Sequence, residues 1–168
     1  MSDDSAATRT AAGLAARLDR LEAEEAVKAL KHRYLRACDA KDAATFRACF
    51  IRQGASIDYG ALGAFDDADA IAAVFERIAL HKVDGKHVVL DMHHGIHPSI
   101  TIHSPTTASG QWTLAFRQVN LTQGTETVMS GEYADEYVVE DGEWKMSRCH
   151  FTRLWSITRS LDDAVVEQ

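Results

Sequence analysis

The spacing of apolar residues changes once along the chain, at Asp84-Gly85. Before this point apolar residues recur at helical spacing, and after it four long β-rich runs follow, at about 87–103, 108–120, 125–140 and 143–156. The runs are separated by turn signals, namely Ser104-Pro105, Gln123-Gly124 and Asp141-Gly142. Helices followed by successive hairpins predict one α+β domain, in which N-terminal helices pack into a strongly curved, mostly antiparallel sheet.

The first half is predicted to hold three helices and one short strand. One stripe of apolar residues, from Leu14 to Cys38 with a short slip, predicts a long first helix that ends around Asp39 to Lys41. Its charged residues, among them Lys28 and Lys31, are expected on the solvated face. The other elements are a helix at 43–50 capped by Asp42, a strand at 55–59, a turn at 60–63 and a helix at 68–79. Residues 1–12 are expected to be a disordered tail, 13–158 the domain, and 159–168 a C-terminal tail.

Charge and composition exclude several classes of protein. The formal net charge is -7, with 25 acidic and 18 basic residues. Such a surface repels nucleic acid and anionic membranes, so neither is an expected partner. Three cysteines, Cys38, Cys49 and Cys149, form neither a disulfide framework nor a zinc motif. With no apolar leader or membrane-length run in this sequence, the expected location is cytoplasmic.

Two segments stand out as candidates for chemistry. Asp39 falls where the first helix ends, and the partial negative charge there disfavours an ionised carboxylate, which suits a base or a partner that holds a histidine. The alternative is an ordinary solvated aspartate. The second segment, Met92 to Pro98, carries three histidines, of which His93 and His97 share one strand face and His94 has the other. Gly95 and Pro98 permit a bulge, so either face remains open for each.

Other candidates lie on the later strands. Arg148 or Arg153 could bind an anionic group or a carbonyl oxygen, and an exposed or interface charge is an equally good interpretation. Trp112 and Phe116 share one strand face and are expected mainly to pack, as are Trp144 and Trp155. The simplest interpretation of the Asp135-Glu136 pair is exposure to solvent, although one of the two carboxylates could turn inward. The substrate-binding candidates are Arg148, His97, His150, Trp112 and Phe116.

These motifs together resemble a known group. Tyr34-x4-Asp39, the His93 to Pro98 strand and the Glu132 to Lys145 hairpin are similar to the SnoaL-like branch of the nuclear-transport-factor-2-like superfamily. The resemblance runs from about Leu18 to Trp155. It implies a cone-shaped α+β barrel with one deep pocket. It also implies that Asp39 orients His93 as the base and that Tyr34 binds substrate, while His97 stands where the dehydrochlorinase type has asparagine.

The function expected on this basis is a cofactor-free lyase, of the dehydratase type, with no metal. An apolar pocket favours a steroid, terpenoid or polyketide as the substrate. Three alternatives remain open: an isomerase or cyclase in the same pocket, a non-catalytic ligand-binding module, and a metal enzyme that uses His93, His94 and His97. Val88-Val89-Leu90 is apolar on both strand faces, so a homo-oligomer, a trimer or dimer, is also expected.

Overall fold

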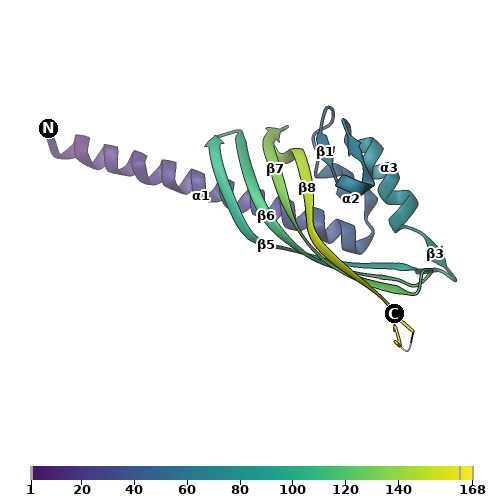
Figure 1. Cartoon of the computed structure of the whole chain (residues 1–168). Helices are drawn as coiled ribbons and strands as arrows, with labels where there is room; N and C mark the ends of the chain where they lie inside the picture. Colours follow the sequence, from purple (N-terminus) through teal and green to yellow (C-terminus); the bar gives the residue numbers. More distant parts are fainter. Residues whose placement is uncertain (1, 163, 168) are drawn as a thin grey trace.

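The computed structural model describes residues 2–162 and 164–167, and its elements follow the predicted order (Figure 1). The helices are α1 (Ser2–Ala40), α2 (Ala43–Ala48), the 3-10 helix η1 (Gly60–Leu62) and α3 (Ala68–Ala79). The strands are β1 (Ser56–Asp58), β2 (Ala64–Phe65), β3 (Lys82–Val83), β4 (Lys86–His87), β5 (Val89–Ser104), β6 (Thr107–Asn120), β7 (Thr125–Glu140) and β8 (Glu143–Ser160).

The large sheet has six strands in the order β2-β1-β8-β7-β6-β5. Strands β5 to β8 form the predicted antiparallel meander, whereas β1 pairs with β8 in parallel. Asp141 and Gly142 both have positive φ, 53° and 82°, as a two-residue hairpin turn requires. The sheet curves strongly and stays open, with β5 at one edge (Figure 1). The α+β prediction is therefore confirmed.

Several boundaries differ from the prediction. Residues 2–12, expected to be disordered, belong to α1, and Met1 lies outside the described residues. Strand β8 continues to Ser160 because it pairs with β7 as far as Thr125, so the predicted C-terminal tail starts with strand. Asp42 caps α2 as predicted, by accepting from Thr45 N–H, and of the three aspartates Asp66, Asp67 and Asp69 that could cap α3 it is Asp67 that accepts, from Asp69 N–H.

The helix α1 carries two apolar faces rather than one continuous stripe. From Val27 onward one face packs against the sheet and is buried, including Leu30 and Tyr34. Leu14, Leu18 and Leu21, predicted to share that stripe, are each more than half exposed. Leu18 and Val27 are nine residues apart, about two and a half turns, so they lie on opposite sides of the helix. No helix of the described chain has the length and apolarity to cross a membrane.

The core lies between α1, the short helices and the inner face of the sheet, and it contains two unexpected charges. Its largest fully buried side chains include Trp112, Tyr137 and Lys31. Lys31 was expected on the solvated face of α1 and is instead buried, in contact with Asp135, which is the carboxylate of the Asp135-Glu136 pair that turns inward. Trp155, expected to pack, is instead 51% exposed in the single chain.

Candidate active site

Asp39 reaches the edge strand because α1 stops immediately after it. Lys41 adopts a left-handed backbone with φ 61°, which ends the helix. The N–H of Asp42 then donates to the carbonyl oxygen of Ala37 at 3.0 Å, which closes the last turn. This cap fixes the end of α1 against β5, with which α1 makes its most extensive contact with the sheet.

Asp39 and His93 form the closest polar contact between α1 and β5. The Nδ1 atom of His93 lies 2.6 Å from Asp39 Oδ1, and the His93 backbone N–H donates to both carboxylate oxygens at 3.1 Å. Because the carboxylate can only accept, the neutral form of the imidazole carries its proton on Nδ1 and its lone pair on Nε2. The backbone contact also satisfies an N–H on the edge of the sheet. The structure thus brings together the two residues proposed from the sequence.

The histidine ring combines an apolar neighbour with access to solvent. The ring of Phe116 lies 4.6 Å from the His93 ring, centroid to centroid. The side chain of His93 is 15% exposed and that of Asp39 is 32% exposed. A small molecule can therefore approach the histidine, while the aromatic contact limits the number of positions that the ring can adopt.

A second polar contact holds the end of α1 to β5, next to the contact between Asp39 and His93. Lys41 forms an ion pair with Asp91, which lies two residues before His93 on β5, and both side chains are almost fully buried. Gln118 Nε2 donates to the other Asp91 oxygen at 2.8 Å. The turn after α1 is therefore held to the edge strand at two successive positions of the same strand face.

Tyr34 lies deeper than Asp39 on the same helix and belongs to a tyrosine pair. Its hydroxyl is 2.7 Å from the hydroxyl of Tyr59, which in turn donates to Cys149 Sγ at 3.6 Å. Burial raises the pKa of both tyrosines well above the ordinary value, so both stay neutral and can donate hydrogen bonds. Tyr59 was not among the candidates because nothing at the end of its predicted strand marks it as a partner of Tyr34.

Next to these tyrosines lies a buried ion pair that the sequence reasoning also missed. Lys31 Nζ is 2.8 Å from Asp135 Oδ2 and 3.4 Å above the centre of the Tyr133 ring. Tyr137 donates its hydroxyl hydrogen to the same Asp135 oxygen at 2.8 Å. The position of Lys31 in the sequence could have indicated its burial. It lies four residues after Val27 and three before Tyr34, within the buried stripe.

Arg148 and His150 are not part of the arrangement around His93. Arg148 donates to Glu136 at 3.1 Å and to Nδ1 of His150 at 3.1 Å, and His150 Nε2 lies 2.8 Å from Ser56 Oγ. Alternation along β8 turns these side chains away from the buried Cys149 and onto the outer face of the sheet. The inward Arg148 considered from the sequence is therefore absent.

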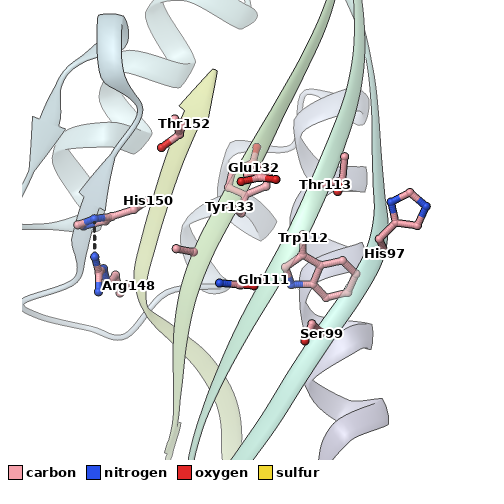
Figure 2. Close-up of a pocket in the computed structure, with 11 residues that line it drawn as sticks. His97, Ser99, Gln111, Trp112, Thr113, Glu132, Tyr133, Arg148, His150 and Thr152 are labelled. Carbon is pink, nitrogen blue, oxygen red and sulfur yellow. Dashed lines mark hydrogen bonds between the residues drawn. The ribbon is translucent and has the colours of Figure 1, made fainter. Parts of the chain in front are cut away.

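A shallow hollow of about 340 Å³ lies on that outer face (Figure 2). Figure 2 shows Glu132 between Arg148 and His150 on one side and His97 on the other. His97 reaches the rim because a bulge between Ile96 and Ser99 gives it a left-handed backbone with φ 52°. Neither Asp39 nor His93 lines this hollow, so the deep pocket expected around them stays a prediction.

The remaining candidates are placed as follows. Trp112 is 1% exposed and donates its indole N–H to the Tyr137 hydroxyl at 3.0 Å, so it belongs to the core. His94 is exposed, on the strand face opposite to His93. Among the described residues, no three histidine, cysteine or carboxylate side chains converge as a metal site would require.

Comparisons with known proteins agree with this fold. Residues 19–150 match the family model of the SnoaL-like domain. None of the curated protein sequences matches this chain. A provisionally named scytalone dehydratase from Novosphingobium aromaticivorans has a TM-score of 0.73 at 19% identity, covering 83% of this chain and 89% of its own.

Two further solved structures show the same likeness. A hexachlorocyclohexane dehydrochlorinase, LinA-type3 of Novosphingobium barchaimii, has a TM-score of 0.72 at 15% identity, covering 85% of this chain and 94% of its own. A protein of unknown function from Mycobacterium tuberculosis has a TM-score of 0.65 at 17% identity, covering 80% and 73%. At such identities the likeness establishes the fold, and the reaction has to be argued from the site.

Proposed function

We propose that this chain, which belongs to the SnoaL-like domain family, is a lyase that eliminates water or another leaving group from a hydrophobic small molecule without a cofactor. The observation that carries the proposal is the 2.6 Å contact between His93 Nδ1 and Asp39 Oδ1. This contact leaves Nε2 free to accept a proton, in a ring that is still accessible. The two solved relatives named for a dehydratase and a dehydrochlorinase are consistent with this chemistry.

The elimination would proceed in balanced steps. His93 Nε2 takes a proton from a carbon beside the leaving group, and the C–H electron pair becomes the new C=C bond. The bond to the leaving group breaks; when that group is hydroxide, it takes the proton back from the imidazolium and departs as water. Asp39 holds the tautomer and stabilises the imidazolium. Tyr34, which lies five residues before Asp39 on α1 and is paired with Tyr59, would donate a hydrogen bond to a carbonyl oxygen that gains charge.

The substrate class follows from the neighbours of the histidine. Phe116 contacts the ring directly, and partly buried Met129 and Phe151 pack on the same core. We propose that these apolar side chains line the substrate site, which favours a steroid, terpenoid or polyketide ring system over a sugar or nucleotide.

The test uses three variants and two probes. Purified protein is incubated with a bicyclic β-hydroxyketone, followed by the absorbance of the enone product, and with hexachlorocyclohexane, followed by chloride release. Asp39→Asn and His93→Ala should each reduce turnover by about 10²–10⁴-fold. His94→Ala, which removes the exposed neighbouring histidine, should leave turnover unchanged. Equal activity of His93→Ala and the intact protein would contradict the proposal, and rearrangement without loss of water or halide would indicate an isomerase or cyclase.

A further inference from the structure

The N-terminal part of α1, here called the arm and defined as residues 10–22, extends away from the body of the chain (Figure 1). Every residue of the arm is exposed. Leu14, Leu18 and Leu21 are 58%, 55% and 58% exposed. A helical segment of this length without packing is only marginally stable in water, so the arm needs a partner.

The leucines of the arm cannot be covered by their own domain. The body contacts α1 through the face that includes Val27, and Leu18 is on the opposite side of the helix. The spacing of Leu14, Leu18 and Leu21 is four and then three residues, which is the d-a-d pattern of a coiled-coil seam. Ala11 occupies the preceding a position. The arm therefore presents a two-heptad seam to another helix.

The charged residues beside the seam indicate which helix packs against it. With Leu14 at d, Arg17 is at g and Glu22 is at the following e position. In parallel coiled coils, g of one chain faces e of the next heptad on its partner, which places Arg17 opposite Glu22 of a second copy. The first ion pairs along α1 join Glu24 and Glu25 to Lys28, and neither Arg17 nor Glu22 has one among the described residues. The sequence is thus self-complementary in parallel orientation.

We propose that the arm associates in parallel with the arm of another copy of this chain through the Leu14–Leu18–Leu21 seam. Parallel, in-register arms require a symmetry axis that runs along them, so the assembly is cyclic. Two heptads bury too little surface to hold two proteins together alone. The arm therefore adds to contacts elsewhere, for which half-exposed Trp155 and Ile157 on β8 are available.

The test is site-directed crosslinking of the full-length protein. Cys38, Cys49 and Cys149 are buried, so the unmodified chain should not crosslink under mild oxidation. Leu21→Cys should give a disulfide-linked dimer, because parallel arms place the two residues 21 side by side. Ala16→Cys is the matched control, equally exposed and at the f position away from the seam, and it should remain mostly uncrosslinked.

The orientation and charges are tested in the same assay. Two outcomes would overturn the proposal. If a mixture of Leu14→Cys and Leu21→Cys proteins forms only mixed dimers, the arms are antiparallel. If Leu21→Cys crosslinks no faster than Ala16→Cys, the seam does not bring the arms together. In the Leu21→Cys background at low salt, Arg17→Glu should slow crosslinking about two- to fivefold, and Arg17→Glu with Glu22→Arg should restore it. Failure of the double reversal to recover would refute the Arg17–Glu22 pairing.

Discussion

Lys31 Nζ lies 2.8 Å from Asp135 Oδ2, and neither side chain is exposed to solvent. The two residues are about a hundred positions apart and join α1 to β7 through the centre of the core. Asp135 Oδ2 also accepts from Tyr137, whereas Asp135 Oδ1 has no hydrogen-bond partner among the described residues. A buried charge is costly unless it is paired, so each of these residues depends on the other.

Replacing Lys31 alone should therefore destabilise the fold strongly. Lys31→Met leaves the Asp135 carboxylate buried without its counter-charge, and we expect a loss of about 3–5 kcal/mol in the free energy of unfolding. Urea denaturation followed by circular dichroism measures the change. The double variant Lys31→Met with Asp135→Asn keeps an oxygen for Tyr137 and removes both charges, so it should recover most of the loss. A double variant as unstable as the sum of the two single variants would show that charge pairing is not the cause.

Local signals predicted the meander and the position of Asp39, whereas the contact between Asp39 and His93 was implied by the resemblance to the SnoaL-like group. Turn dipeptides define the hairpins, and the end of a helix places Asp39. Lys31 was assigned to solvent, and exposure was the simplest interpretation of Asp135, because a charged residue is ordinarily exposed. Their pairing depends on a tertiary contact that no local pattern encodes. The Tyr34–Tyr59 pair was missed for the same reason.

The sequence could not assign the direction of the Arg148 side chain, and the reason is a different one. Two irregularities in the pairing of β7 with β8, at Ser130/Gly131 and Glu136/Tyr137, shift the register. Each such shift changes which side chains face inward, so alternation counted along the sequence does not assign a face. The same reasoning applies to His97, whose bulge turns it onto the outer rim of the sheet.

Asp39→Asn should change the tautomer of His93 without moving the strand. The asparagine oxygen can still accept the His93 backbone N–H, whereas its NH₂ group can only donate to Nδ1. Nε2 would then carry the proton and could no longer act as a base, as the loss of turnover requires. Nitrogen-15 NMR of the imidazole should show Nδ1–H in the unmodified protein and Nε2–H in the variant. Observation of the same tautomer in both would remove this explanation.

Lys41 is expected to position the Asp39–His93 pair. Lys41→Met leaves Asp91 nearly buried with Gln118 as its remaining side-chain partner, which should loosen the end of α1 against β5. The His93 amide, protected by Asp39, should then exchange with solvent about tenfold faster or more by hydrogen-exchange NMR. Lys41→Arg should retain protection. Lys28→Met, which removes an ordinary solvated ion pair of α1, is the control and should leave this amide unaffected.

Alkaline pH should destabilise the protein through its buried thiols and phenols. Burial, followed by the Asp135 charge, raises the pKa of the Cys149 thiol from 9.0 to about 12, and burial also raises the pKa of Cys38. A group whose pKa is higher in the folded state stabilises the fold below its unfolded pKa. That contribution is lost as the pH rises through the folded pKa, here from about pH 9 toward pH 12.

Each such group should therefore lower the free energy of unfolding by about 1.4 kcal/mol per pH unit once the unfolded chain is ionised. Cys38→Ala removes one of them, so its free energy of unfolding should fall less steeply with pH than that of the unmodified protein. Urea denaturation under reducing conditions at pH 8, 9, 10 and 10.5 compares the two slopes. Curves that stay parallel above pH 9 would mean that the Cys38 thiol does not contribute. A common decline in both proteins would then come from Cys149 and from the tyrosines Tyr34, Tyr59, Tyr133 and Tyr137, whose pKa values burial also raises.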